Sequence, residues 1–185
     1  MVSGSEVVVV CTANICRSPM AQALLAGRLA AAGAAVTVRS GGMLGGGEPP
    51  GPEVAAAMAG YGLDVSSHRS RQLTAGDLEA ADLILAMARE NLRYAVVTAP
   101  AVWPRAFTLP ELVRRGGAIG RRPPGESLAR WLARAHEGRQ RSALLGDCAD
   151  DDVADPTGGP QRGYTVTAAV LSGLVDRLVG LCWSA

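Results

Sequence analysis

The segment from Cys11 to Ser18 contains the residues of this chain that could do chemistry. It reads CTANICRS, so Cys11 is followed after five residues by Arg17 and then by Ser18. A cysteine thiolate is a nucleophile, and the planar guanidinium of an arginine offers two donors that match two oxygens of a phosphoryl group. The spacing therefore predicts attack on phosphorus by Cys11, with Arg17 binding the phosphate and tightening on the charge of the transition state.

The elements on either side of this segment are expected to make it an anion-binding loop. Residues 6–10 (EVVVV) form a β-branched run, typical of a strand buried on both faces of a parallel sheet. Pro19 stands where a helix would begin. Backbone N–H groups converge in such a loop, and the helix N-terminus adds the positive end of its dipole. Such a field favours the thiolate form of a cysteine, so we expect Cys11 to be a thiolate and a nucleophile, with Ser18 donating a hydrogen bond to its sulfur.

The residues between the cysteine and the arginine are expected to surround the bound phosphate. Asn14 tolerates a left-handed backbone and can lock a tight turn through its side chain. A buried cysteine followed by a solvent-exposed arginine is the alternative interpretation of so short a motif. The buried strand before it, the serine after the arginine and the proline at the helix start favour the phosphate loop. The expected phosphate-binding residues are Thr12, Ala13, Asn14, Ile15, Cys16 and Ser18.

Strands and helices alternate along the rest of the chain. Further strands are expected at residues 36–39, 83–87 and 103–109. Helices are expected at residues 20–33, 53–61, 128–139 and 165–181, with shorter helical stretches beginning at 74, 89 and 110. Residues 41–52, 116–125 and 148–163 are expected to be loops. The alternation predicts an α/β fold: one domain over residues 1–185, a three-layer sandwich in which helices cover both faces of a four-stranded parallel sheet, with the phosphate loop after strand one.

The composition excludes several classes of function. All 18 cationic side chains are arginines, which excludes a Schiff-base lysine and a nucleotide-binding loop that needs a lysine. The two histidines, His68 and His136, are not spaced as metal ligands, and no metal or cofactor is expected. A net charge of +1 gives no basic surplus for nucleic acid or a membrane. No secretory segment or apolar run of about 20 residues is visible, so we expect a cytoplasmic protein whose cysteines are free thiols.

The stretch VVVVCTANICRSPMAQALL resembles the signature of the low-molecular-weight protein tyrosine phosphatases. The resemblance implies a small α/β fold and a phosphotyrosine-containing protein substrate that is hydrolysed through a phosphocysteine intermediate. It also implies a general acid in an Asp-Pro pair far along the chain, which Asp155-Pro156 matches. By this resemblance, Asp155 protonates the leaving oxygen and then activates water against the phosphocysteine.

Shorter stretches elsewhere also resemble this family. Residues 40–42 (SGG) resemble its Ser-Ala-Gly, so that Ser40 is expected to hydrogen-bond Asn14. Residues 68–73 (HRSRQL) resemble another stretch, in which His68 is expected to be a structural hydrogen-bonding group. The family thiol that matches Cys16 forms a reversible disulfide with the nucleophile, which implies a redox-sensitive pair; a small buried residue at the helix start is the alternative.

The chain departs from the family pattern around the substrate slot. Ala13 stands where the family has glycine, which requires a negative φ. Residues 157–159 (TGG) follow the Asp-Pro pair in place of two aromatic residues, so the slot should be wider or have different walls. The larger aromatic side chains elsewhere are expected in the core rather than at the slot. They are Trp103, Phe107, Trp131 and Tyr164.

The connection over residues 99–149 is longer than in compact members of the family. It adds an Arg-rich helical segment around residues 110–145, with arginines that include Arg114, Arg115, Arg121 and Arg122. Two interpretations stay open: a solvated surface, or a docking face for an acidic phosphoprotein.

A protein tyrosine phosphatase is the function that these residues favour. Protein-arginine phosphatase, a branch of the same family, is the alternative: Ile15 stands where that branch has threonine, whereas residues 155–159 (DPTGG) resemble it. Arsenate reductase is less favoured because residues 77–100 contain no cysteine to carry a disulfide away from the nucleophile. A non-catalytic phosphate-binding module would not need all of Cys11, Arg17 and Asp155.

Overall fold

A computed structural model describes residues 5–146 and 148–183. The expected domain also includes residues 1–4, 147 and 184–185, which lie outside the described residues.

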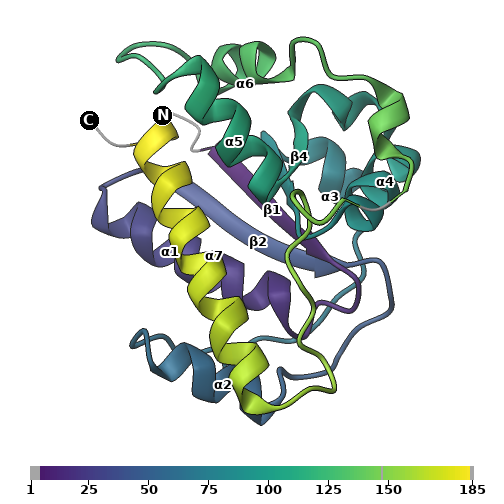
Figure 1. Ribbon diagram of the computed structural model, residues 1–185, viewed down its shortest axis with the longest axis vertical. Helices are drawn as coiled ribbons and strands as arrows, with labels where there is room; N and C mark the ends of the chain where they lie inside the picture. The colour runs from purple at the N-terminus through teal and green to yellow at the C-terminus, as the bar shows by residue number, and fades with distance from the viewer. Residues whose placement is uncertain (1–4, 147, 184–185) are drawn as a thin grey trace.

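Four parallel strands form one sheet in the order β2-β1-β3-β4 (Figure 1). β1 (Ser5–Cys11) is central, between β2 (Val36–Gly42) and β3 (Leu83–Ala86), and β4 (Ala106–Thr108) follows β3. This order places a topological switch point beside the C-terminal end of β1, where open α/β sheets bind their ligands. The predicted four-stranded parallel sheet is therefore confirmed, with its switch point directly before the Cys11 loop.

Helices cover both faces of the sheet, as the alternating pattern predicts. Successive side chains of a strand point to opposite faces, and Val7 and Val9 belong to one hydrophobic core while Val8 and Val10 belong to another. The first core contains α1 (Arg17–Ala31), α2 (Pro52–Ala59), α5 (Leu109–Ile119), α6 (Leu128–His136) and α7 (Gln161–Cys182). The second contains α3 (Ala75–Ala80), α4 (Arg89–Thr98) and the 3₁₀ helices η1 (Pro100–Arg105) and η2 (Arg141–Leu144).

The last helix, α7, is long and apolar enough to cross a membrane by length and composition alone. In this fold it lies along α1 and also packs on α2 and α5 (Figure 1). Leu171, Val175 and Leu178 of α7 are almost completely buried in the first core. The core contacts of the helix therefore account for its apolar face.

β2 runs further than its β-branched residues predict, and this extension touches the Cys11 loop. Gly42, the last residue of β2, lies so close to the loop that a Cβ placed on it would be 2.7 Å from the Thr12 carbonyl oxygen. The next residue, Met43, donates its backbone N–H to the same oxygen at 2.8 Å. Glycine thus allows the two segments to approach each other closely.

The strand expected at residues 103–109 is wrong in its first half. Residues from Pro100 to Arg105 form η1, and only Ala106–Thr108 pair with β3. Pro104 has no N–H for a sheet ladder, which favours the helical turn. Thr108 then accepts a hydrogen bond from the Glu111 N–H and begins α5.

The loop expected at residues 116–125 also starts too early. Helix α5 continues through Gly116 and Gly117 to Ile119. A Cβ on Gly116 would lie 2.8 Å from the Trp131 ring, so this glycine is a packing residue of α5 against α6 rather than a helix end. The other expected helices have bounds that are shifted by about one turn or less.

Gly116→Ala is expected to lower the free energy of unfolding by about 1–3 kcal/mol, because the added methyl group overpacks against Trp131. The adjacent Gly117 is a matched control, since a Cβ there meets no heavy atom within 4 Å among the described residues. Gly117→Ala should raise the free energy of unfolding by about 0.5–1 kcal/mol because alanine favours a helix. Urea unfolding followed by circular dichroism measures both changes. Equal stability of the two variants would contradict the packing role of Gly116.

Candidate active site

A cleft of about 320 Å³ opens at the C-terminal end of β1. Its lining residues come from the Cys11 loop, the start of α4 and the loop before α7; they are Cys11, Thr12, Ala13, Ile15, Cys16, Arg17, Glu90, Asp155 and Thr157. Three segments that are far apart in the chain therefore meet at the switch point.

Cys11 lies at the bottom of this arrangement, as the last residue of β1. Its Sγ is 2.9 Å from the Ser18 hydroxyl oxygen. That oxygen already accepts a hydrogen bond from Asn14 Nδ2 at 2.9 Å, so its own proton is available for the sulfur. A hydroxyl that donates to sulfur stabilises negative charge there. The contact between Ser18 and Cys11 is the one that the sequence predicts.

Asn14 organises the loop around Cys11. Its φ is 56°, the only positive value at a non-glycine residue within the described part of the chain. The side chain is completely buried, and it donates to the hydroxyls of Ser18 and Ser40 at 2.9 Å and accepts from the Arg71 N–H at 3.0 Å. His68 Nε2 lies 2.8 Å from the Asn14 carbonyl oxygen. The predicted contact between Ser40 and Asn14 is therefore present, and His68 makes a structural hydrogen bond, as expected of it.

The loop leaves its backbone donors available for an anion. Within residues 5–146 and 148–183, the N–H groups of residues 12–16 donate to no protein acceptor. Helix α1 follows at once, and its N-cap residue Cys16 makes no side-chain capping bond. Ala13, where the family has glycine, does not have a positive φ. Unpaired N–H groups beside a helix N-terminus are a common binding site for phosphate.

Arg17 extends across the cleft while almost fully buried. Its Nη2 lies 2.5 Å from Asp155 Oδ2, and its Nη1 donates to the Val153 carbonyl oxygen at 3.2 Å. Its Nε–H is buried and has no hydrogen-bond partner among the described residues. Buried polar groups are nearly always paired, so this unpaired donor, next to the unpaired loop N–H groups, fits a tetrahedral oxyanion.

Asp155 faces the same cleft from the loop that precedes α7. Its Oδ1 accepts from the backbone N–H of Thr157 at 3.1 Å and from the hydroxyl of Thr157 at 2.7 Å, and its side chain is 40% exposed. Burial, together with the nearby Asp155 charge, raises the pKa of Cys16 to about 12. Cys16 is therefore a neutral thiol at neutral pH, and Cys11 is the cysteine placed for attack.

Glu90 and Asn91 are site residues that sequence reasoning missed. The Thr12 hydroxyl donates to Glu90 Oε1 at 2.9 Å and accepts from Asn91 Nδ2 at 3.2 Å. Both residues lie in the first turn of α4, directly after β3, and parallel strands bring their C-terminal ends to one edge of the sheet. Their position just after a buried strand is the feature of the sequence that could have identified them as site residues.

Aromatic side chains do not line the cleft in the part of the chain that the structure describes. Ile15, Thr157 and Glu90 contribute to its walls instead. The larger aromatic residues are buried in the cores, as predicted; they are Trp103, Phe107, Trp131 and Tyr164. Tyr164 also has a local role, because its hydroxyl accepts from the Gly158 N–H at 3.2 Å and so anchors the segment after Asp155.

Comparison with known proteins agrees with this geometry. Residues 6–115 match the family model of the low molecular weight phosphotyrosine protein phosphatases. The chain belongs to this family. It is 42% identical over 106 residues to the probable low molecular weight protein-tyrosine-phosphatase EpsP of Ralstonia solanacearum, an alignment that covers 57% of this chain and 71% of the relative. It is also 28% identical over 174 residues to the protein-arginine-phosphatase of Geobacillus stearothermophilus, covering 94% of this chain and 93% of the relative.

A solved structure of a family member extends the likeness to almost the whole chain. The low molecular weight protein tyrosine phosphatase from T. tengcongensis matches with a TM-score of 0.73 and 32% identity, covering 96% of this chain and 99% of that one. The family model itself stops at residue 115, so it includes Cys11, Arg17 and Glu90 but not Asp155. The family resemblance inferred from the Cys11 loop is thus confirmed, and the fold likeness continues beyond the matched segment.

Replacing Asn14 should show how far the phosphatase loop depends on one side chain. Asn14→Gly and Asn14→Ala both lose the hydrogen bonds to Ser18 and Ser40, and both are expected to bind phosphate more weakly. Only alanine is strained at a positive φ, so Asn14→Ala should be less stable than Asn14→Gly by about 1 kcal/mol. Isothermal titration with phosphate and thermal unfolding provide the two measurements. Unchanged phosphate affinity in both variants would contradict the organising role of Asn14.

Proposed function

We propose that the protein is a protein tyrosine phosphatase that hydrolyses phosphomonoesters through a phosphocysteine on Cys11. The observation that carries this proposal is the unpaired, buried Nε–H of Arg17, which lies beside a loop of free N–H groups and a nucleophilic sulfur. These donors match the oxygens of a phosphoryl group. Asp155, at the open side of the same cleft, is the group within reach of a leaving oxygen.

In the first step, the Cys11 sulfur attacks phosphorus while the loop N–H groups and Arg17 hold the phosphoryl oxygens. The bond from phosphorus to the ester oxygen breaks as the sulfur–phosphorus bond forms. Asp155 gives its proton to the leaving oxygen. The substrate phosphate replaces Asp155 as a partner of Arg17, which leaves the Asp155 carboxyl group free to face the leaving oxygen.

In the second step, water attacks the phosphocysteine. The Asp155 carboxylate takes a proton from this water, the sulfur–phosphorus bond breaks, and inorganic phosphate leaves. The electron pair of the broken bond returns to the Cys11 sulfur, where the Ser18 hydroxyl stabilises the negative charge. The chain needs no metal or cofactor for either step, because Arg17 and the loop provide the positive field.

We also infer that residues 1–185 act as one phosphatase domain in the cytoplasm, on phosphoproteins. The cysteines support this location, because all four are free thiols in the structure and structural disulfides are rare in reducing compartments. The reversible disulfide between Cys11 and Cys16 stays a prediction. The raised pKa of Cys16 slows its attack on an oxidised Cys11, because the thiolate is the reactive form.

Protein-arginine phosphatase is the second candidate, and Glu90 is the observation that favours it. The carboxylates of Glu90 and Asp155 both line the cleft, and a phosphorylated guanidinium is more cationic than a phosphorylated phenol. The Geobacillus stearothermophilus relative with this name aligns over 94% of the chain. Ile15 favours the tyrosine phosphatase, because the arginine branch carries threonine at the matching position.

Cys11→Ser is expected to abolish turnover of 4-nitrophenyl phosphate, because the hydroxyl is not ionised near neutral pH. Asp155→Asn should lower kcat by about 10²–10⁴-fold, because no carboxylate then takes the proton of the water that attacks the phosphocysteine. Cys148→Ala is the matched control, since this half-buried cysteine does not line the cleft. Release of 4-nitrophenolate measures all three. Turnover by Cys11→Ser at the wild-type rate would refute the phosphocysteine route.

Glu90→Gln tests the choice between the two substrates. Removing this charge should weaken a cationic substrate only, lowering kcat/KM for a phosphoarginine peptide by about twofold to fivefold and leaving a phosphotyrosine peptide unaffected, as expected for one exposed charge. Phosphate release from the two peptides measures the ratio. Wild-type preference for phosphoarginine by more than about tenfold would replace our first proposal with the second.

A further inference from the structure

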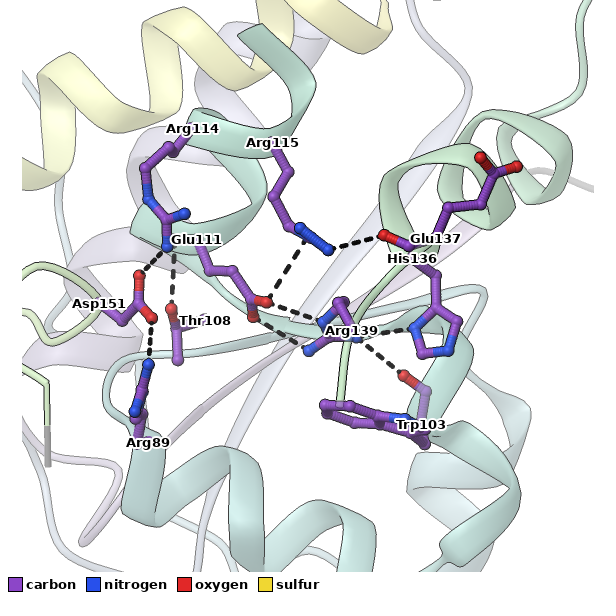
Figure 2. A network of polar contacts seen from close by, with 10 residues as sticks. All are labelled: Arg89, Trp103, Thr108, Glu111, Arg114, Arg115, His136, Glu137, Arg139 and Asp151. Atoms are coloured by element: carbon purple, nitrogen blue, oxygen red, sulfur yellow. Dashed lines mark hydrogen bonds and ion pairs between the residues drawn. The ribbon is translucent and has the colours of Figure 1, made fainter. Parts of the chain in front are cut away.

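Three arginines of the segment around residues 110–145 make contacts within the protein in Figure 2: Arg114, Arg115 and Arg139. Arg114, on α5, points toward the loop that carries Asp155 and pairs with Asp151, with its Nη2 2.5 Å from Asp151 Oδ1. Arg89, the first residue of α4, holds the other oxygen of Asp151 at 2.8 Å. These three residues are called the Asp151 cluster below.

Asp151 is almost completely buried within this cluster. Burial would raise the pKa of its carboxyl group, but the hydrogen bonds from Arg89 and Arg114 outweigh it and hold the pKa below the usual value. A carboxyl group whose pKa is lowered by folding stabilises the protein at pH values above its usual pKa near 4. This contribution is lost as the pH falls through the lowered pKa. The cluster is therefore fully ionised throughout the neutral range, where both guanidinium groups hold the carboxylate.

The residues that follow Asp151 continue this attachment into the active site. Asp152 Oδ1 accepts from the backbone N–H of Arg89 at 2.7 Å. Val153 donates its N–H to the Met87 carbonyl oxygen at 2.7 Å, and its own carbonyl oxygen accepts from Arg17. Residues 151–153 are thus fixed to the end of β3, the start of α4 and the phosphate-binding arginine, two residues before Asp155.

Arg114 belongs to α5, and contacts of Glu111 fix this helix in place. Glu111, one turn before Arg114 on α5, makes a two-pronged pair with Arg139 at 2.7 and 3.0 Å. The guanidinium of Arg139 lies 3.8 Å from the centre of the Trp103 ring and 4.0 Å from that of Phe107. Such a stacked and bidentate arginine is held in one orientation. Arg114 therefore extends toward the loop from a firmly anchored helix.

We propose that the Asp151 cluster positions the general acid: through Arg114 and Arg89 the Arg-rich segment holds the loop that places Asp155 at the cleft. The proposal rests on the phosphatase function proposed above. Residues 149–160 form no helix or strand, so Asp155 has no regular element of its own to fix it. Asp151 and Arg114 are positioning residues, since neither lines the cleft.

A positioning role predicts a selective loss. An activated leaving group such as 4-nitrophenolate is weakly basic and departs without a well-placed proton. Phenolate resembles the tyrosine side chain, with a pKa of about 10, and needs that proton as its bond to phosphorus breaks. A loosened acid loop should therefore slow phenyl phosphate far more than 4-nitrophenyl phosphate. A general weakening of the fold, or of Arg17, should slow both equally.

The main comparison is Asp151→Asn against Asp150→Asn, with kcat/KM measured for both esters because this parameter reports the steps up to phosphocysteine formation. Asp150 is an exposed neighbour, so its variant is a matched control. Asp151→Asn should lower kcat/KM for phenyl phosphate by about tenfold or more, and that for 4-nitrophenyl phosphate by less than about twofold. Asp150→Asn should change neither.

A second comparison keeps the proposal testable if Asp151→Asn does not fold. Arg114 is 58% exposed, so Arg114→Ala removes little packing, and Arg130→Ala on α6 removes another exposed arginine that pairs with a carboxylate. Arg114→Ala should show the same selective loss, and Arg130→Ala should not. Equal losses with both esters, or none, would overturn the positioning role. Absence of wild-type turnover that depends on Cys11 would instead overturn the proposed function.

Discussion

A loop can offer several backbone N–H groups to one anion only if its own carbonyl groups turn away from them, and Asn14 imposes this constraint. Its left-handed backbone turns the chain between β1 and α1, and its buried side chain bonds to Ser18, Ser40 and Arg71. Because Asn14 occupies the Ser18 oxygen, the Ser18 proton is directed to Cys11. The nucleophile and the anion site thus depend on the same side chain.

The sheet order supplies the partners that Asn14 needs. β2 pairs with β1 in parallel, which brings Ser40 next to the loop, and Gly42 lets the end of that strand touch Thr12. On the other side of β1, β3 leads into α4 and places Glu90 at the cleft. Residues from both neighbours of β1 therefore surround a loop that the chain forms locally.

The parts of the site that sequence reasoning predicts are those whose geometry is local or carried by a short motif. Cys11, Arg17 and Ser18 lie within eight consecutive residues, and a strand, a loop and a helix start fix their arrangement. Glu90 and Asp151 were missed because their roles arise from contacts with residues far away in the chain. The predicted end of helix α5 comes too early for the same reason. Gly116 makes room for the Trp131 ring, and no local sequence pattern indicates that contact.

Arg17 has two kinds of partner, and this has a thermodynamic consequence. The same guanidinium that would bind phosphate also holds the Val153 carbonyl oxygen, two residues before Asp155. Occupancy of the anion site and order in the loop are therefore linked equilibria, and each must change the other by the same factor. Through Asp151, the linkage reaches α5. The hydrogen-exchange rates of backbone amides in that distant helix should thus change when an oxyanion fills the loop.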